Sequence, residues 1–315
     1  MSDEVILGFD SSNYTTSLAV LDSDGRLLIN LKRLLKVDKG ERGLRQSDAV
    51  FAHIKNYPEL LDEASGVLSG KKVIAVGVSN APRKVIGSYM PCFLVGENLA
   101  SSASFAASCP LYRFSHQCGH ISAALFSSGD LEYFHKPFAA FHVSGGTTEL
   151  LRVTPVLGGF DAEIVGGTKD ISAGQLVDRI GVKMGLGFPS GAAIEELARK
   201  NNRAIPKRKV TRDGLFLNLS GVENISERLY RETNDKSLTA AFVLDYIGRA
   251  LVELSEEYIN CYGDTHFIYA GGVMSNFIIK EMLKSRFSSS FAEPRLSSDN
   301  AVGIAYLAYL SHLKQ

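Results

Sequence analysis

The chain has 315 residues, of which 45% are hydrophobic and 22% charged, with 29 glycines and 9 prolines, and this composition excludes fibrous and low-complexity proteins. Lysine plus arginine and aspartate plus glutamate number 34 each, so no global field draws the protein toward nucleic acid or a membrane surface. Any site for a polyanion therefore has to be local, and the length favours two medium domains over one large core.

Two apolar runs near the N-terminus, 5–9 and 18–21, flank the segment DSSNYTTS and predict a β-hairpin with a tight turn. The runs 138–143 and 150–153 flank SGGTTE in the same way. The hydroxyl residues of the two turns correspond in order: Ser12, Thr15 and Thr16 in the first, Ser144, Thr147 and Thr148 in the second. Such a repeat predicts two similar halves, with a chance likeness of two threonine-rich turns as the alternative.

The segments between and after the hairpins alternate between helical and strand patterns. Residues 49–68 have helical spacing that is broken at Pro58, and 72–79 reads as a buried strand. Further helices are predicted over 172–183, 192–200, 238–258 and a C-terminal segment opened by Asp299 and Asn300 at the N-cap, and a strand over 266–269. This alternation predicts an α/β protein.

The segment FSHQCGH places His116 and His120 four residues apart in the first turns of a predicted helix. Residues at this spacing share one helical face, so both imidazoles could bind one metal ion. A zinc protease of the HExxH type needs a glutamate after the first histidine, and here that residue is Gln117, which cannot take a proton. Spacing alone leaves metal ligands and hydrogen-bonded structural histidines equally favoured.

Two glycine-rich turns follow predicted strands, SGGTT at 144–148 and YAGGVMSN at 269–276. Backbone N–H groups in such turns can approach a phosphate closely, although a plain turn is the commoner meaning. Asp178 lies mid-helix and could face a ligand there. The segment RKNNRAIPKRKVTR at 199–212 concentrates basic residues; it could contact phosphates, but a solvated loop rim is slightly favoured.

The cysteines and the N-terminal residues indicate the cellular compartment in which the protein is found. Cys92, Cys109, Cys118 and Cys261 form no CxxC pair, which fits a reducing compartment. The start MSDEVILGFD lacks the basic residues and long apolar run of a signal peptide, and no segment reaches the roughly 18 apolar residues of a membrane span. We therefore expect a cytoplasmic protein with no membrane partner.

Segments of the chain resemble, in the same order, the motifs of the tRNA N6-adenosine threonylcarbamoyltransferase family, formerly described as O-sialoglycoprotein endopeptidases (peptidase family M22). ILGFDSSNYTTSLAV is similar to the family's ILGIETSCDDTAVAI, SHQCGH to its HxxxH motif, and FHVSGGTTELL to LVSGGHTQL. DISAGQLVDRIGVKMGLGFPSGAAIEELA is similar to DDAAGEAFDKVAKLLGLPYPGGPAIEKLA, AGGVMSN to AGGVAAN, and SSDNAVGIA to CTDNAAMIA. The resemblance covers essentially the whole chain, and the motifs taken jointly are highly specific.

The resemblance implies the actin-like ATPase (ASKHA) fold, with two similar α/β domains and a ligand cleft between them. We expect one domain over 1–112 plus 297–315 and the other over 113–296. It further implies one divalent metal ion, iron or zinc, held by His116, His120 and Asp299.

The implied activity is transfer of a threonylcarbamoyl group from threonylcarbamoyl-adenylate to N6 of adenosine 37 in tRNA, with the metal polarising the donor as a Lewis acid. Asp10 and Asp178 are the expected catalytic carboxylates. The expected site for an adenine nucleotide or the adenylate donor consists of His142, Val143, Ser144, Gly145, Gly146, Asp178, Gly191 and Asn276. The implied partners are tRNA and the other proteins of the threonylcarbamoyl-adenosine complex, with the oligomeric state left open.

Several positions depart from the family's motifs. Asp10 stands where the family has glutamate, Thr147 where it has histidine, and Ile171 where it has aspartate; Ala81, Pro82 and Arg83 replace a Gly-Pro-Gly turn, and Glu223 replaces a lysine. A glutamate beside a phosphate ligand would repel it. The alternatives are therefore a divergent paralogue with another acceptor, or a nucleotide-binding, non-catalytic subunit of a complex. A carbohydrate kinase of the same fold comes third and a protease last.

Overall fold

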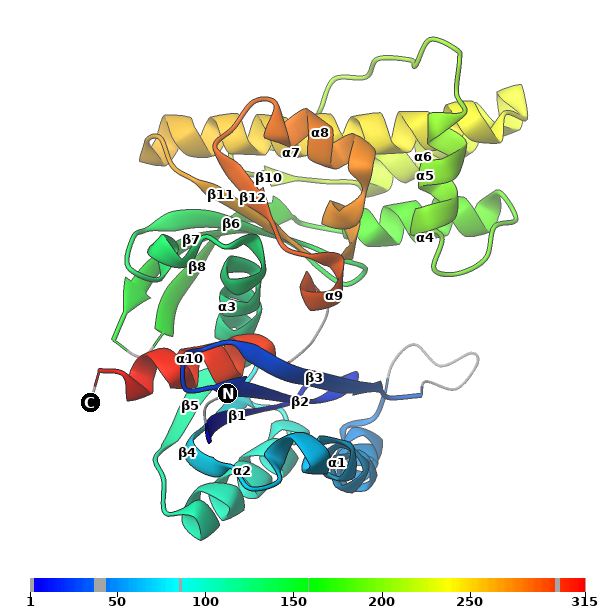
Figure 1. The fold of residues 1–315 in the computed structure, drawn as a ribbon. Coiled ribbons are helices and arrows are strands. Elements are labelled where there is room, and N and C mark those ends of the chain that lie inside the picture. The colour runs from blue at the N-terminus through cyan, green and yellow to red at the C-terminus, as the bar shows by residue number, and fades with distance from the viewer. Residues whose placement is uncertain (1–2, 37–43, 85–86, 158, 298–300, 315) are drawn as a thin grey trace. The chain divides into compact units, whose positions relative to one another are not determined.

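The structure is a computed structural model that describes residues 3–36, 44–84, 87–157, 159–297 and 301–314 (Figure 1). The chain divides into two compact units. Unit 1 comprises Met1–His135, Pro155–Asp161 and Arg295–Gln315, and unit 2 comprises Lys136–Thr154 and Ala162–Pro294.

Unit 1 is built on a five-stranded sheet with the strand order β3-β2-β1-β4-β5. Its strands are β1 (Glu4–Ser11), β2 (Thr15–Asp22), β3 (Leu27–Leu34), β4 (Lys72–Ala81) and β5 (Leu111–Ser115). β1, β2 and β3 form an antiparallel meander, whereas β4 runs parallel to β1 and β5 parallel to β4. The hairpin predicted near the N-terminus is therefore confirmed.

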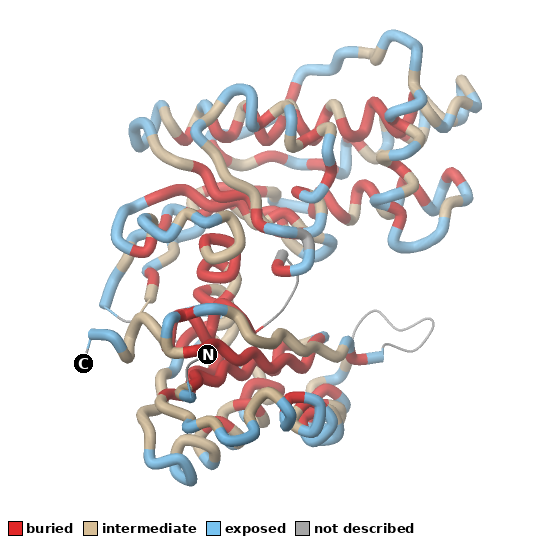
Figure 2. Tube along the Cα trace, in the orientation of Figure 1, coloured by how far each residue is buried: buried red, intermediate tan, exposed pale blue. Residues whose placement is uncertain are grey.

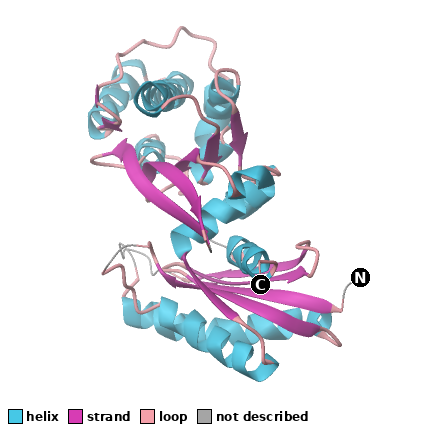
Figure 3. Ribbon diagram, turned by 90° about the vertical axis from the view of Figure 1, so that its left-hand side faces the viewer, coloured by secondary structure: helices cyan, strands magenta, loops and turns pink. Residues whose placement is uncertain are grey.

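Helices cover both faces of this sheet, which explains why β2 is buried along its whole length. The helical elements associated with unit 1 are α1 (Gln46–Leu68), α2 (Phe93–Ala107), α3 (His116–Ser128), the short η1 (Leu131–Phe134), α9 (Pro294–Ser297) and α10 (Val302–His312). α1 and α2 pack on one face and α10 on the other, with α3 packed against α10 (Figure 3).

The predicted break at Pro58 is wrong, because α1 continues through this residue. A proline inside a helix leaves the carbonyl of the residue four positions earlier, here Ile54, without its usual partner. Pro58 and Ile54 are both exposed, so water can satisfy that carbonyl, while Tyr57 and Leu60 on the opposite face are buried in the core.

Unit 2 repeats the strand order of unit 1 within a seven-stranded sheet, β12-β11-β6-β7-β8-β10-β9. Its strands are β6 (Phe138–Val143), β7 (Thr148–Val156), β8 (Gly159–Thr168), β9 (Arg212–Asp213), β10 (Phe216–Leu217), β11 (Phe267–Ala270) and β12 (Ser289–Phe291). β6 pairs antiparallel with β7 and parallel with β11, as β1 does with β2 and β4. The predicted second hairpin and the internal repeat are confirmed.

The helices of unit 2 bury one large apolar core against this sheet. They are α4 (Ala173–Lys183), α5 (Gly191–Arg199), α6 (Ser220–Thr233), α7 (Lys236–Tyr262), the short η2 (Gly272–Ser275) and α8 (Phe277–Lys284). α4 begins with a capping box in which the side chains of Ser172 and Gln175 each accept a hydrogen bond from the other's backbone N–H. Tyr269 and Phe141 stack across neighbouring strands with ring centroids 5.2 Å apart.

The buried residues follow the central strands of each sheet and the inner face of α7 (Figure 2). Across the part of the chain that the structure describes, no helix combines the length and the apolar sequence needed to cross a membrane. The cytoplasmic location stays a prediction.

Candidate active site

The two hydroxyl-rich turns adopt the same hydrogen-bonded conformation. In the first turn Ser12 N–H donates to the Thr15 carbonyl at 3.0 Å, and Thr15 N–H donates to Ser12 Oγ at 3.2 Å. In the second, Ser144 N–H donates to the Thr147 carbonyl at 2.7 Å, and Thr147 N–H donates to Ser144 Oγ at 3.2 Å. The serine side chain that opens each turn thus accepts a backbone hydrogen bond, and Ser12 Oγ also donates to the Thr15 carbonyl at 3.3 Å.

The first turn is further held by the fully buried His53 of α1. His53 Nε2 lies 2.9 Å from the Ser12 carbonyl oxygen, and Nδ1 lies 2.7 Å from Thr16 Oγ1. A carbonyl only accepts, so Nε2 carries the proton and Nδ1 accepts from the threonine hydroxyl. Burial lowers the pKa of His53, and we conclude that it is a neutral structural residue.

The two histidines of the FSHQCGH segment face each other on α3, as their spacing predicts. Ser115 caps the helix by accepting a hydrogen bond from Cys118 N–H at 3.2 Å. His116 Nε2 and His120 Nε2 lie at hydrogen-bond distance, 3.0 Å apart, so both nitrogens can reach one ion when neither carries a proton. Cys118 points elsewhere, with its Sγ 3.4 Å from the carbonyl oxygen of Phe160.

A carboxylate from β1 reaches the far side of this pair. Asp10 Oδ1 lies 3.0 Å from His116 Nδ1, and the Ser79 hydroxyl also donates to this oxygen. Asp10 and Ser79 are both completely buried. A carboxylate behind a histidine is the arrangement that orients histidine ligands in metal sites, so the described residues can supply two imidazole ligands to a divalent ion.

The predicted third ligand, Asp299, lies outside the described residues. Within the described part of the chain, no group of three or more His, Cys, Asp or Glu side chains is arranged to hold a metal ion. α10 begins at Val302 with Ala301 as its N-cap residue, so the prediction that Asp299 and Asn300 occupy the N-cap is wrong. The metal site therefore stays a prediction.

A second group of candidate binding residues lies in unit 2, around an apolar cavity of about 580 Å³. Four of the residues predicted to bind nucleotide line it, namely Gly145, Asp178, Gly191 and Asn276. The other predicted residues do not line it: His142 and Val143 end β6, and Ser144 and Gly146 belong to the following turn. The cavity is also lined by residues that the sequence analysis missed, among them Phe188, Glu195 and Val273.

Hydrogen bonds to the helices fix the walls of this cavity. Asp178 Oδ1 accepts from Ser190 N–H at 2.7 Å, which ties the segment carrying Phe188 to α4. Asn276 Oδ1 caps α8 by accepting from Ile279 N–H at 3.1 Å. Glu195 Oε2 accepts from Phe277 N–H at 3.3 Å. Asp178 and Asn276 therefore shape the cavity as well as lining it.

Close backbone approach explains the glycines beside the cavity. A Cβ on Gly174 would lie 2.4 Å from the Ser144 carbonyl oxygen, so α4 can begin against the second turn only with glycine there. Gly271 has φ +102° and its Cβ would lie 2.3 Å from the Val143 carbonyl oxygen.

The family model described as tRNA N6-adenosine threonylcarbamoyltransferase matches residues 38–306. The chain is 30% identical over 320 residues to the tRNA N6-adenosine threonylcarbamoyltransferase of Streptococcus pneumoniae (strain Taiwan19F-14), covering 97% of this chain and 92% of that relative. The chain belongs to the tRNA N6-adenosine threonylcarbamoyltransferase family, a family of transferases.

Solved structures establish the fold of this family member. The chain is similar to component A of (R)-2-hydroxyglutaryl-CoA dehydratase from Acidaminococcus fermentans, with a TM-score of 0.54 and 14% identity over 98% of this chain and 99% of that one. It is also similar to the activator of the 2-hydroxyisocaproyl-CoA dehydratase from Clostridium difficile, with a TM-score of 0.56 and 14% identity over 98% and 96%. The predicted actin-like ATPase fold is confirmed.

The lysine-to-glutamate departure from the family's motifs is compensated locally. Glu223 of α6 accepts from Arg179 at 3.0 Å and from Lys183 at 3.1 Å, both on α4. A hydrogen bond from Lys183 to Glu227, together with its contact to Glu223, raises the pKa of Lys183. The carboxylate is thus paired with two cations, which reduces the repulsion of a phosphate expected from the sequence alone.

The basic segment 199–212 is also largely paired within unit 2. Five of its cations lie within 3.2 Å of a carboxylate: Arg199 with Glu195, Lys200 with Glu196, Arg203 with Asp235, Lys207 with Asp245 and Arg212 with Glu257. These contacts favour the solvated rim over a dedicated phosphate surface, because neighbouring carboxylates cancel much of the field.

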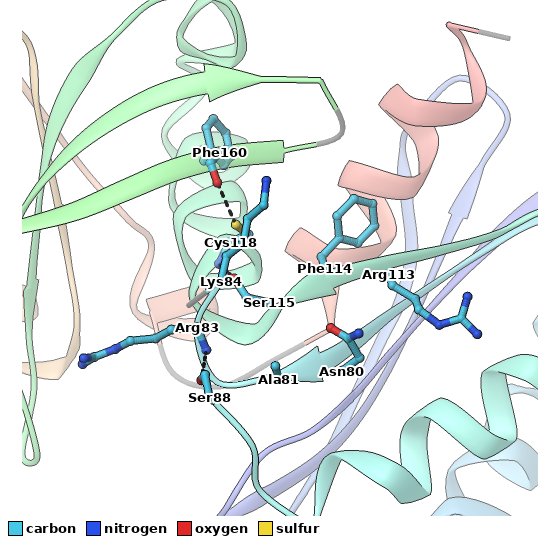
Figure 4. Close-up of a pocket in the computed structure, with 10 residues that line it drawn as sticks. All are labelled: Asn80, Ala81, Arg83, Lys84, Ser88, Arg113, Phe114, Ser115, Cys118 and Phe160. Carbon is cyan, nitrogen blue, oxygen red and sulfur yellow. Dashed lines mark hydrogen bonds between the residues drawn. The ribbon is translucent and has the colours of Figure 1, made fainter. Parts of the chain in front are cut away.

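The family's Gly-Pro-Gly turn is replaced in this chain by Ala81, Pro82 and Arg83, and Ala81 and Arg83 line a cavity of about 400 Å³ in unit 1 (Figure 4). Arg83, Lys84 and Arg113 line it. Arg113 is bound by Glu97 at 2.7 Å, and the guanidinium groups of Arg83 and Arg113 point in opposite directions in Figure 4. The cations do not converge on one point, so this cavity is not a built anion site.

Proposed function

We propose that this chain transfers a threonylcarbamoyl group from threonylcarbamoyl-adenylate to N6 of adenosine 37 in tRNA. Family membership supports the reaction class. The observation that carries the proposal within the molecule is the 3.0 Å separation of His116 Nε2 and His120 Nε2, with the buried Asp10 behind His116. A hydrolytic protease is not favoured, because Gln117 cannot act as a general base.

In this proposal His116 and His120 hold one divalent ion, iron or zinc, with Asp299 as a third ligand implied by the family resemblance. When bound, the ion supplies Lewis-acid polarisation of the donor's carbonyl and phosphate oxygens. The chain's own contribution is positional: α3 presents both imidazoles on one face, and the Ser115 cap fixes where that helix begins.

The cavity of unit 2 is the proposed site for the adenine nucleotide part of the donor. Its walls are mostly apolar, with a few polar side chains, a combination typical of small-molecule sites. These polar side chains are Asp178, Glu195, Ser275 and Asn276. The Clostridium difficile activator, which has the same fold, was solved with bound ADPNP. The exposed Phe188 ring at the cavity can pack against a base.

A nucleotide-binding subunit without its own catalysis is the second candidate. The paired basic segment 199–212 favours it, since a surface neutralised by its own carboxylates gives little attraction to tRNA. Under this alternative the unit 2 cavity still binds nucleotide, whereas a partner protein supplies the contacts with tRNA.

The deciding experiment is threonylcarbamoylation of purified tRNA in the presence of the donor and of the complex's other proteins. We expect threonylcarbamoyl-adenosine to accumulate only when this chain is present, measured by mass spectrometry of digested tRNA. Full nucleotide binding with no product under these conditions would favour the non-catalytic alternative. Formation of product in cells that lack their own enzyme, after expression of this chain, is the corresponding test in vivo.

Replacing Asp178 by alanine is expected to weaken adenine nucleotide binding by about tenfold, the loss typical of removing one hydrogen bond that holds a site in shape. The change removes the acceptor for Ser190 N–H and releases the segment that carries Phe188. Isothermal titration with ADP measures the effect.

Asp170→Ala is the matched control for this prediction. Asp170 also accepts backbone hydrogen bonds in unit 2, from Leu219 N–H at 2.8 Å and Ser220 N–H at 2.9 Å, but it does not line the cavity. This variant should lose stability and keep its affinity for ADP. Equal losses of affinity in both variants would show that the effect of Asp178 is not local.

A further inference from the structure

The buried contacts of Asp10 differ from those expected of a carboxylate that attacks or protonates a substrate. Its side chain has no exposed surface, and Oδ1 is engaged by both His116 Nδ1 and the Ser79 hydroxyl. Among the described residues, its second oxygen, Oδ2, has no hydrogen-bond partner. The carboxylate therefore acts on His116 rather than on a ligand.

We propose that Asp10 is a positioning residue that fixes the proton of His116 on Nδ1, buttressed by Ser79, and that its half-satisfied buried charge is compensated when a divalent cation binds the histidine pair. This inference rests on the proposed metal at His116 and His120 and goes beyond it by assigning roles to Asp10 and Ser79.

The choice of histidine tautomer follows from the chemistry of the contact. An ionised carboxylate only accepts hydrogen bonds, so the 3.0 Å contact with Asp10 requires a proton on His116 Nδ1. In neutral imidazole the other nitrogen, Nε2, then carries a lone pair, and this atom faces His120 Nε2. The Phe93 ring, 5.8 Å from the His116 ring between centroids, limits rotation of the imidazole.

Asp10 itself is held rigidly. It lies in β1 between β2 and β4, and the backbone pairing of these strands fixes its position. Ser79 lies on β4, which is the parallel neighbour of β1. A hydroxyl on one strand thus fixes a carboxylate on the next, and the carboxylate fixes the first residue of α3.

The charge of Asp10 is poorly compensated by the groups around it. The titratable side chains that feel this charge include Tyr57 and Cys92, and burial together with Asp10 raises the pKa of the Tyr57 hydroxyl far above its usual range and that of the Cys92 thiol to about 11. Both are therefore neutral at pH 7. A cation at the histidine pair supplies the positive charge that a buried carboxylate otherwise lacks.

Two opposite effects are expected from Asp10→Asn. Zinc affinity, measured by competition with a chromophoric chelator, should fall about 10- to 100-fold, the usual loss when the carboxylate behind a histidine ligand is removed. The melting temperature of the metal-free protein should rise, because the amide removes a buried charge that has an unpartnered oxygen. General damage to the fold would lower both quantities.

Ser79→Ala keeps the Asp10 carboxylate and removes only the hydroxyl that donates a hydrogen bond to it. We therefore expect a smaller loss of zinc affinity, about three- to tenfold, as for one hydrogen bond. Ser17→Ala is the matched control, because this buried serine donates to the backbone carbonyl of Asp10 and not to its carboxylate. Ser17→Ala should leave zinc affinity unchanged. If Asp10→Asn does not fold, Ser79→Ala against Ser17→Ala decides the proposal.

His116→Ala separates this inference from the proposed metal site. Unchanged zinc affinity in His116→Ala would remove the metal proposal and this inference together. Loss of zinc affinity in His116→Ala combined with wild-type affinity in Asp10→Asn and Ser79→Ala would overturn the positioning role alone. A nitrogen-15 histidine spectrum of the metal-free protein, in which His116 should carry its proton on Nδ1, provides a readout independent of activity.

Discussion

Replacing His120 by alanine is expected to lower the rate of threonylcarbamoyl transfer by about 10²- to 10³-fold, the range observed when one group that stabilises developing charge is removed. In the proposed mechanism one of two imidazole ligands is lost, so the remaining His116 cannot hold the ion alone. The affinity of unit 2 for ADP should not change, because His120 does not line that cavity. Single-turnover transfer to tRNA and titration with ADP measure the two quantities.

His135→Ala is the control for the His120 variant, since His135 is an exposed histidine of the same unit that lies at the end of η1. It should transfer at the wild-type rate. A His120 variant that retains full activity would remove the metal-centred mechanism, whereas one that loses both activity and ADP affinity would indicate that the whole protein is disturbed.

Local periodicity was sufficient to predict both hairpins and the long helices α1 and α7, but β3, β5, β8, α2 and α6 were not predicted. Each predicted hairpin pairs through alternating residues of two adjacent runs, and each turn is closed by its own serine. The error at Pro58 has a physical cause: a sequence shows that proline removes a hydrogen bond, but not that the orphaned carbonyl faces solvent. Whether a helix tolerates proline depends on tertiary exposure.

Contacts within the candidate site could be predicted between residues that are close in the sequence. Contacts between residues that are far apart in the sequence could not be predicted. His116 and His120 share a helical face because they are four residues apart, and spacing showed this. The contact between Asp10 and His116 spans 106 positions and depends on the strand order of unit 1, which gave Asp10 its neighbour Ser79. The domain boundaries expected from the resemblance stay a prediction.

The ion-pair partners of the charged side chains were the feature of the structure that the sequence predicted least well. The segment 199–212 looks basic in sequence, yet its cations contact carboxylates of two helices, α5 and α7, including Asp245 and Glu257 of α7. Glu223 likewise looks like a charge reversal until its contacts with Arg179 and Lys183 are known. A charge pattern read along the chain cannot show which opposite charges the fold brings beside it.

Replacing Gly303 by alanine is expected to destabilise the protein by about 3 kcal/mol or more, at or above the usual cost of overpacking a core. A Cβ at this position of α10 would lie 1.9 Å from the Gly119 carbonyl oxygen and 2.6 Å from the Ala123 backbone nitrogen. Both atoms belong to the backbone of α3, so no side-chain rotation can relieve the overlap and the two helices must separate. Urea unfolding followed by circular dichroism measures the loss.

Gly66→Ala is the matched control, because Gly66 also lies in a helix of unit 1 and a Cβ there would meet no atom within 4 Å. Alanine is the better helix former by about 1 kcal/mol, so this variant should be slightly more stable than the wild type. Gly119 lies between His116 and His120, so separating α10 from α3 also moves the segment that presents both imidazoles. We therefore expect Gly303→Ala to weaken zinc binding and Gly66→Ala to leave it unchanged; equal stability of the two variants would contradict the close contact between α3 and α10.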